Sequence, residues 1–292
     1  MRNRRLGTSD LVVSEVGFGA WTIATDWWGK VDDKAGLVHA ALDAGVTFFD
    51  TAPVYGDDGF GETILAEILG CRDDVIVTTK VGYDIDAPRI APGHSERPQD
   101  WRPESVRSQV EASLRRLGRD HIDLLQLHNP PLSLISRAGT WEPLEEMKHE
   151  GLIRFYGLSV HPPEEGVAAV QATMPDTVQI VYNLARREAE DTFLATAQAA
   201  NVGVIAREPL ANGFLAGRYN AASTWEHGDI RSRMPRPYVA QLCALGQRVR
   251  ELAEQSGMTA AQLALKFVLD RTEIACAIVG MKTVQQVEEN LN

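Results

Sequence analysis

Four side chains that can transfer protons occur in the first half of the chain. Asp50, Lys80 and His128 each come at the carboxyl end of a short apolar, β-type segment, and Tyr55 lies in the loop after the first segment. If these segments are neighbouring strands of a parallel barrel, their carboxyl ends meet at its catalytic face. A carboxylate, a phenol, an ammonium and an imidazole together predict a proton-transfer site, rather than a metal cage or an acyl-transfer triad.

Each of these residues also has an ordinary structural explanation. Asp50 precedes Thr-Ala-Pro and could only form a turn, Lys80 could be a solvated charge at a strand end, and Tyr55 a loop aromatic. His128 precedes Asn-Pro and could be a hydrogen-bonded core histidine. We favour the catalytic interpretation, because the ordinary explanation would have to hold four times, in this order, at strand ends.

The elements that position these residues follow from an alternation of short apolar runs with amphipathic helical patterns. Strands are expected at residues 13–19, 47–50, 75–80, 122–127, 153–159, 177–182, 203–207 and 276–280. Helices are expected at residues 32–44, 62–69, 103–117, 141–148, 164–172, 191–200, 239–256 and 259–270. Strands separated by helices form right-handed βαβ units, so the pattern predicts an α/β fold, a (β/α)8 TIM barrel.

Residues 6–12, with a Gly-Thr-Ser-Asp turn inside, are expected to form a short N-terminal β-hairpin. Long loops at residues 81–101 and 208–237 are expected at the catalytic face, where such loops often bind ligands. Trp21, Trp27, Trp28 and Trp101 lie in or beside loops of this face and could line a substrate pocket or simply cover the core.

Composition narrows the class of protein. The 292 residues, 44% hydrophobic and 24% charged, suit one barrel domain spanning 1–292. A net charge of −11 argues against a nucleic-acid surface, and no run of about 18 apolar residues predicts a membrane span. Three cysteines without a close pair, and no signal peptide, indicate a reducing compartment, so a cytoplasmic protein is expected.

Motifs over most of the chain resemble those of the aldo-keto reductases. They are DTAPVYG at 50–56, GE at 61–62, TK at 79–80, DLLQLHNP at 123–130, GLS at 157–159, QIVYN at 179–183, PLANGFLAG at 209–217 and EENL at 288–291. The resemblance implies a barrel that binds NADPH in an extended conformation at the catalytic face and reduces aldehydes or ketones reversibly.

The resemblance also implies a role for each of the four residues. Tyr55 would donate a proton to the developing alkoxide. Lys80, as an ammonium beside it, would favour the tyrosinate and lower the pKa of Tyr55, while Asp50 would keep Lys80 charged and oriented. His128, as a neutral imidazole, would polarise and align the substrate oxygen.

For the nicotinamide, Ser159 and Gln179 match the family positions that hold its carboxamide. Val160 stands where an asparagine is common, so one hydrogen bond is missing or replaced. Arg207 stands where many relatives carry an aromatic residue that stacks on the ring. A guanidinium could stack instead, with a charge that disfavours the oxidised ring, or Arg207 could pair with Glu208 or an acidic loop.

For the adenosine half, Lys282 and Thr283 match the segment that grips the 2′-phosphate. Gln286 occupies a position often held by arginine, so the preference for NADPH is open and NADH is possible. Asn290 matches the residue that contacts adenine. The chain ends at Asn292, where many relatives continue over the substrate, which predicts either an open pocket or an incomplete chain.

Two other classes stay open: a regulatory protein that senses NADP(H) with little turnover, and an isomerase or lyase on a generic barrel. The intact four-residue set argues against the first without excluding it. A metal is not expected from His121, Asp123 and His128, because 123 and 128 face opposite sides of a strand and 121 lies at its wrong end. The partner expected is a small carbonyl compound, and the sequence gives no indication of an oligomeric state.

Overall fold

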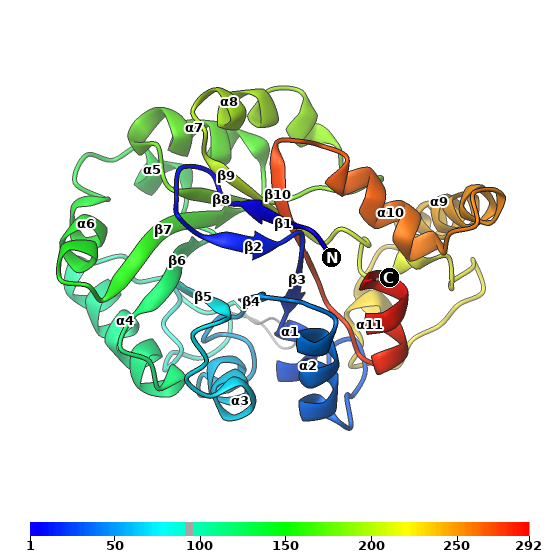
Figure 1. The fold of residues 1–292 in the computed structure, drawn as a ribbon, viewed down its shortest axis with the longest axis horizontal. Coiled ribbons are helices and arrows are strands. Elements are labelled where there is room, and N and C mark those ends of the chain that lie inside the picture. Colours follow the sequence, from blue (N-terminus) through cyan, green and yellow to red (C-terminus); the bar gives the residue numbers. More distant parts are fainter. Residues whose placement is uncertain (91–95, 292) are drawn as a thin grey trace.

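The computed structural model describes residues 1–90 and 96–291. Residues 91–95, within the long loop expected at 81–101, and Asn292 lie outside the described residues. The centre is a closed barrel of parallel strands in the order β10-β3-β4-β5-β6-β7-β8-β9 (Figure 1), which confirms the predicted TIM barrel. These strands are β3 (Val16–Gly19), β4 (Phe48–Asp50), β5 (Ile76–Val81), β6 (Ile122–His128), β7 (Ile153–Val160), β8 (Thr177–Val181), β9 (Gly203–Arg207) and β10 (Ile274–Val279).

Helices surround the barrel on its outside (Figure 1). The longer ones are α2 (Lys34–Asp43), α3 (Phe60–Leu69), α4 (Pro103–Leu117), α6 (Glu142–His149), α7 (Pro163–Thr173), α8 (Phe193–Ala199), α9 (Arg236–Gln255), α10 (Ala260–Leu269) and α11 (Val284–Leu291). Most lie within a few residues of the predicted ranges, but α11 was not predicted, because its residues are mostly polar and only Val287 is buried. None of the described helices has both the length and the apolar character needed to cross a membrane.

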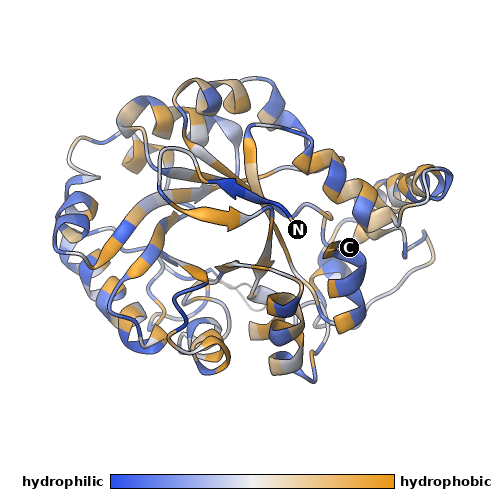
Figure 2. Ribbon diagram, in the orientation of Figure 1, coloured by the Kyte–Doolittle hydropathy of each residue, from blue (hydrophilic) through white to orange (hydrophobic). Residues whose placement is uncertain are grey.

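Two apolar layers hold the barrel together. The larger layer lies between the outer faces of the strands and the helices, and every residue of β6 is buried. Figure 2 shows this pattern as apolar strands and helix faces turned inward, with polar residues outside. Parallel strands covered on both faces read as continuous apolar runs, which is why these segments were recognisable in the sequence.

An N-terminal hairpin lies across one end of the barrel (Figure 1). Its strands β1 (Asn3–Arg5) and β2 (Val12–Ser14) pair antiparallel, so the predicted residues 6–12 form mainly the connecting turn. The first barrel strand starts at Val16, not at residue 13, because Val13 pairs with Arg4 in the hairpin. Leu6, Leu11 and Val13 close this end by packing into the second apolar layer, inside the barrel.

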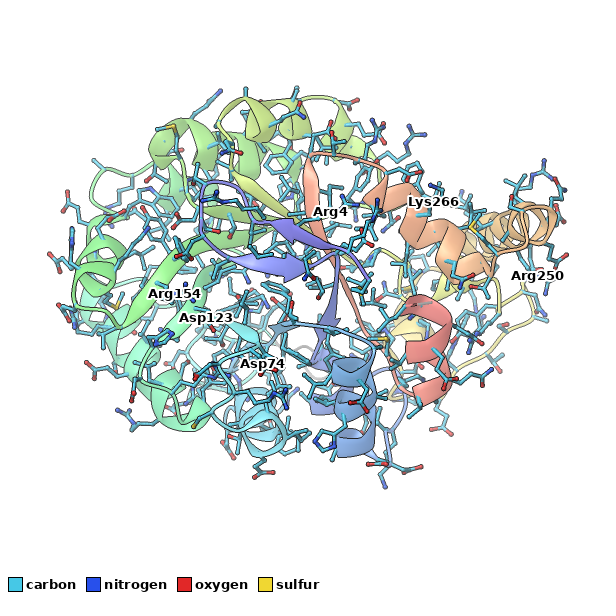
Figure 3. All side chains as sticks on the ribbon, in the orientation of Figure 1. Arg4, Asp74, Asp123, Arg154, Arg250 and Lys266 are labelled. Atoms are coloured by element: carbon cyan, nitrogen blue, oxygen red, sulfur yellow. The ribbon has the colours of Figure 1, made fainter. Side chains whose placement is uncertain are left out.

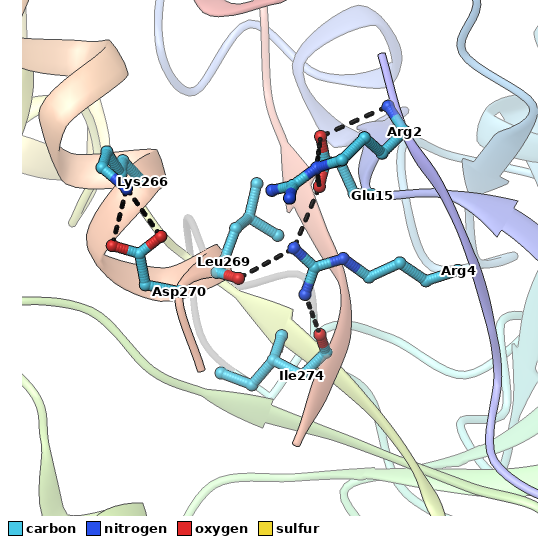
Figure 4. A network of polar contacts seen from close by, with 7 residues as sticks. All are labelled: Arg2, Arg4, Glu15, Lys266, Leu269, Asp270 and Ile274. Carbon is cyan, nitrogen blue, oxygen red and sulfur yellow. Dashed lines mark hydrogen bonds and ion pairs between the residues drawn. The ribbon is translucent and has the colours of Figure 1, made fainter. Parts of the chain in front are cut away.

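Arg4 fastens the hairpin to the last strand (Figure 4). Its guanidinium donates to the carbonyl oxygens of Ile274 and Leu269, at 3.0 and 2.8 Å, and to the Glu15 carboxylate at 3.0 Å. Leu269 is the last residue of α10, where carbonyls have no partner within the helix. Arg4 therefore joins the start of the chain to the junction between α10 and β10.

Short helices interrupt the catalytic-face loops. They are α1 (Trp21–Ala24), α5 (Leu132–Ile135), and the 3-10 helices η1 (Glu188–Glu190), η2 (Phe214–Ala216) and η3 (Ile230–Arg233). The region around Trp21 was expected to be a loop, because the four residues of α1 are too few to show a helical period. The loop between β9 and α9, expected at 208–237, is long as predicted.

Candidate active site

Asp50, Lys80 and Tyr55 meet at the catalytic end of neighbouring strands. Asp50 ends β4, Lys80 lies near the end of β5, and Tyr55 follows β4 in a loop. Strands β4 and β5 pair directly, and so do β5 and β6, which ends at His128. Because parallel strands expose their carboxyl ends on one side, the expected convergence is present in the structure.

The Lys80 ammonium has three donors, and all three are used. Nζ donates to Asp50 Oδ1 at 2.6 Å, to the carbonyl oxygen of Thr51 at 2.9 Å and to the Tyr55 hydroxyl oxygen at 3.0 Å. Lys80 has no exposed surface and Asp50 is 2% exposed. A buried charge is tolerated only when paired and hydrogen-bonded, and this set satisfies Lys80 completely.

Burial shifts the pKa values of Tyr55 and Lys80, an influence that the sequence did not reveal. Burial raises the pKa of Tyr55 above its usual value, and the opposing influence of Lys80 is smaller. Lys80 lowers the pKa of Tyr55, as predicted, but burial outweighs this influence and the charge of Asp50 adds to the rise, so the net shift is upward. Although burial opposes it, the pKa of Lys80 is raised by Asp50 and Tyr55, so the amine stays charged.

His128 lies beside Tyr55 as a neutral imidazole. Its ring meets the Tyr55 ring edge-on, with 5.9 Å between centroids, and the ring of Tyr83 at 5.0 Å. Burial, followed by the charges of Lys80 and Arg207, holds the pKa of His128 well below 6.5. Tyr83 was not predicted; its hydroxyl accepts a hydrogen bond from Asn129 at 3.2 Å.

The second oxygen of Asp50 is held by two buried amides. Gln179 on β8 donates from Nε2 to Asp50 Oδ2 at 2.8 Å, and Gln126 on β6 donates to the same oxygen at 3.2 Å. Gln126 was not predicted as a site residue, although a single amide in the apolar run Ile-Asp-Leu-Leu-Gln-Leu-His is a usable signal. A buried amide in a strand needs polar partners, and here Asp50 is one of them.

Three of the four predicted tryptophans form a wall against Tyr55. Trp21 stacks on the Tyr55 ring, with centroids 5.0 Å apart and 5° between the planes. Trp27 and Trp28 contact Trp21 at 5.8 and 4.8 Å between centroids. These rings give the site an apolar side next to the phenol.

Trp101 lies apart from this wall. It packs over Gly82, and its Nε1 donates to Gln99 Oε1 at 3.2 Å. Trp101 also lines a separate pocket of about 130 Å³, together with residues such as Leu127 and Leu134. The structure therefore brings together Trp21, Trp27 and Trp28, and its described residues show no ring contact between Trp101 and Tyr55 or His128.

Arg207 extends from the end of β9 toward Ser159. Its Nη1 donates to Ser159 Oγ at 3.2 Å, and its Nη2 lies 2.8 Å from His161 Nδ1. Ser159 Oγ in turn donates to Gln179 Oε1 at 3.2 Å. The alternative of an Arg207–Glu208 ion pair is not present within the described chain.

Lys282 and Thr283 directly precede α11, and Gln286 lies in its first turn. The Thr283 hydroxyl accepts from the Gln286 N–H at 3.2 Å, and Gln286 Oε1 accepts from the Lys282 N–H at 2.8 Å. Asn290 lies further along the same helix. Lys282 Nζ donates to the carbonyl oxygen of Trp28 and, among described residues, has no carboxylate partner.

A segment of the β9–α9 loop contacts the backbone of Trp27 and Trp28, next to Lys282. Asp229 and Arg231 form a buried ion pair at 2.6 Å. Arg231 also lies 3.5 Å from the Trp28 carbonyl, and Ile230 N–H donates to the Trp27 carbonyl at 2.8 Å. Burial, followed by the charge of Arg231, lowers the pKa of Lys282. The β9–α9 loop thus holds the tryptophan segment next to Lys282.

The opposite end of the barrel holds Asp123 and His121. Asp123 pairs with Arg154 at 3.0 Å (Figure 3), and His121 Nε2 lies 3.6 Å from the same carboxylate. These residues lie at the start of β6, whereas His128 ends it. In the part of the chain that the structure describes, no cluster of three or more histidine, cysteine or acidic residues could hold a metal ion.

Comparison with known proteins places this site in a family. The sequence model of the Aldo/keto reductase family matches residues 15–292. The chain is similar to the aldo-keto reductase YhdN of Bacillus subtilis, at 30% identity over 99% of this chain and 87% of that one. It is equally similar, at 30%, to an L-galactose dehydrogenase of Arabidopsis thaliana, covering 99% and 86% of the two chains.

Solved structures of similar proteins have the same fold. A glycerol dehydrogenase from Gluconobacter oxydans superposes with a TM-score of 0.84 and 31% identity, covering 99% of this chain and 89% of that one. An aldo-keto reductase from Bacillus halodurans, in its holo form, gives 0.79 and 28%, covering 100% and 90%. The protein therefore belongs to the aldo/keto reductase family and is an NAD(P)H-dependent oxidoreductase that acts on small carbonyl compounds or their alcohols.

Proposed function

We propose that the protein reduces an aldehyde or ketone with NADPH, and that Tyr55 donates the proton. The observation that carries this is the hydrogen bonding of Lys80. Its third N–H is directed at the Tyr55 oxygen, so Tyr55 accepts there and its own proton is left to be donated elsewhere. A hydroxyl that accepts from an ammonium is also a better proton donor, because the positive charge stabilises the phenolate left behind.

The other residues orient this transfer. Asp50 keeps Lys80 charged and directed at Tyr55. His128, neutral and edge-on to the phenol, donates a hydrogen bond to the substrate oxygen and holds it at the Tyr55 hydroxyl. Bound NADPH supplies the hydride. In the reverse direction Tyr55 accepts the proton of the alcohol.

The nicotinamide end of the cofactor site consists of Ser159, Gln179 and Arg207. Both N–H groups of Gln179 are in use, toward Asp50 and Gln126, and among the described residues its Oε1 accepts only from Ser159. The second lone pair of that oxygen is therefore the group that fits a carboxamide N–H. Arg207, held by Ser159 and His161, presents a planar cation next to this position.

The adenosine end consists of Lys282, Thr283, Gln286 and Asn290. Lys282 is a cation without a carboxylate partner in the described chain, beside the first turn of α11. A helix N-terminus and a cation that has no carboxylate partner among the described residues together suit a phosphate dianion. This supports NADPH over NADH.

We also propose that residues 1–292 form one domain, because the pairing of β3 with β10 closes the barrel.

The tryptophan wall suits several classes of carbonyl substrate. The tryptophan wall beside Tyr55 offers flat apolar faces, which pack on aromatic aldehydes and also on the C–H faces of sugars and polyols. Two similar proteins are named for glycerol and L-galactose. A carbonyl panel should therefore contain aromatic, aliphatic and hydroxylated aldehydes.

Loss of the phenol tests the proposal. NADPH oxidation is followed with the carbonyl panel, and NADPH binding by quenching of tryptophan fluorescence. Tyr55→Phe should lower kcat by about 100-fold or more with NADPH affinity nearly unchanged. Tyr83→Phe is the matched control, because this phenol also contacts His128 but lacks the Lys80 bond.

Equal kcat in Tyr55→Phe and the unmodified protein would remove Tyr55 as the donor. Quenching by NADPH without turnover of any carbonyl would instead favour a protein that senses NADP(H).

A further inference from the structure

Gln126 lies in the barrel interior with no exposed surface, between Asp50 and Gln179. The orientation of its amide is fixed by its partners. A carboxylate only accepts hydrogen bonds, so Gln126 must present its nitrogen to Asp50 Oδ2. Its second N–H donates to Thr78 Oγ1 at 2.8 Å, and its Oε1 accepts from Gln179 Nε2 at 3.2 Å. Both N–H groups of Gln126 and one lone pair of its oxygen are therefore used, and the partners fix which end of the amide is the nitrogen.

These bonds set the direction of the Asp50 carboxylate. With Oδ2 held by Gln126 and Gln179, Oδ1 faces Lys80 at 2.6 Å. Lys80 in turn directs its third N–H at Tyr55. The position of the ammonium relative to the phenol therefore depends on the two amides behind the carboxylate.

The two amides differ in their surroundings. Gln179 is connected through Ser159 to Arg207, at the end of the site proposed for nicotinamide. In the described part of the chain, the side-chain hydrogen-bond partners of Gln126 all lie inside the barrel: Asp50, Thr78 and Gln179. A ligand that competes for the Gln179 amide would weaken the hydrogen bond from Gln179 to Asp50 Oδ2. The hydrogen bond from Gln126 to the same oxygen would persist.

We propose that Gln126 is a positioning residue for carbonyl reduction, which keeps Asp50 turned toward Lys80 and joins this ion pair to the Gln179–Ser159 end of the site. The inference rests on the proposed function. Gln126 acts through Asp50 and Lys80 and does not touch the reacting atoms. Its loss should therefore affect turnover more than the binding of substrate or cofactor.

The test compares Gln126→Met with Thr78→Val. The first removes the donor to Asp50 at nearly constant volume, and the second removes the other acceptor of Gln126 but leaves the Asp50 bond intact. Gln126→Met should lower kcat by about 10- to 100-fold, as expected for a hydrogen bond to a charged group. The KM for the carbonyl and the affinity for NADPH should change by less than about 3-fold, and Thr78→Val should retain most of the kcat.

The pH profile separates positioning from packing. Gln126→Glu keeps the size and the acceptor for Gln179 but places an oxygen against Asp50. Its kcat should fall as well, and most steeply at alkaline pH, where two adjacent carboxylates repel.

Gln126→Met or Gln126→Glu with the kcat and pH profile of the unmodified protein would overturn the inference, as would an equal loss in Thr78→Val. If Gln126→Met does not fold, Gln126→Glu decides the question. Tyr55→Phe is measured alongside: an inactive Tyr55→Phe beside a fully active Gln126→Met rejects only this inference. An active Tyr55→Phe rejects the proposed function itself.

Discussion

Removing the Lys80 ammonium should cost the fold as well as the reaction. Lys80→Met preserves the length of the side chain but leaves the Asp50 carboxylate, 2% exposed, with two amide donors and no cation. Breaking a buried ion pair by removing one partner costs about 3–5 kcal/mol, because the remaining charge is uncompensated. For 292 residues the entropy of unfolding is about 0.6 kcal/mol/K, so Tm should fall by about 5–8 °C.

The cause can be isolated with a double-mutant cycle. The double variant Asp50→Asn/Lys80→Met has neither the carboxylate nor the ammonium. Its loss in the free energy of unfolding should be smaller, by at least about 2 kcal/mol, than the summed losses of Asp50→Asn and Lys80→Met. Urea unfolding followed by tryptophan fluorescence measures all four proteins. The matched control is Lys266→Met, which removes an exposed lysine paired with Asp270 and should leave Tm unchanged.

Strict additivity in the cycle would refute the reasoning, because it would mean that Lys80 stabilises the fold without compensating Asp50. A Tm for Lys80→Met that matches the Lys266→Met control would refute it as well.

Two further predictions concern the cofactor and pH. Lys282→Ala should weaken NADPH binding by about 10-fold or more and NADH binding much less, as measured by fluorescence quenching; parallel losses would remove Lys282 from the 2′-phosphate. His128 is neutral when folded, with a pKa well below 6.5, but takes up a proton near 6.5 when unfolded. The free energy of unfolding should therefore fall on acidification from pH 7 to pH 5, by up to about 1.4 kcal/mol per pH unit from this residue, and His128→Gln should flatten that part of the urea-unfolding profile.

The strand ends were predictable because each carries one reactive residue directly after an apolar run, as at Asp50 and Lys80. The hydrogen bonds from the two amides to Asp50 were not predictable, because Gln126 and Gln179 are 76 and 129 residues away from Asp50 in the sequence. The net rise in the pKa of Tyr55 was not foreseen for a related reason, although Lys80 lowers it as predicted. Burial decides it, and burial depends on rings such as Trp21 that only the fold brings there.

Local signals failed where elements are short. The helix at Trp21–Ala24 has too few residues for a period, and the hairpin was shifted because pairing of Val13 with Arg4 is set by register rather than by composition. The bracing of the tryptophan segment by Arg231 uses a backbone carbonyl, which no side-chain pattern reveals.

The closure of the barrel has a consequence for biosynthesis. Val16 on β3 pairs with Ala277 on β10, and Arg4 bonds to Ile274, so the first strand gains its second neighbour only when the end of the chain has been made. Until then β3 presents an unpaired edge, the kind of surface that pairs with other chains. Contacts this distant in sequence also slow folding. Newly made chains should therefore be most prone to aggregate before β10 is in place, and a nascent chain that stops short of residue 274 should depend most on chaperones.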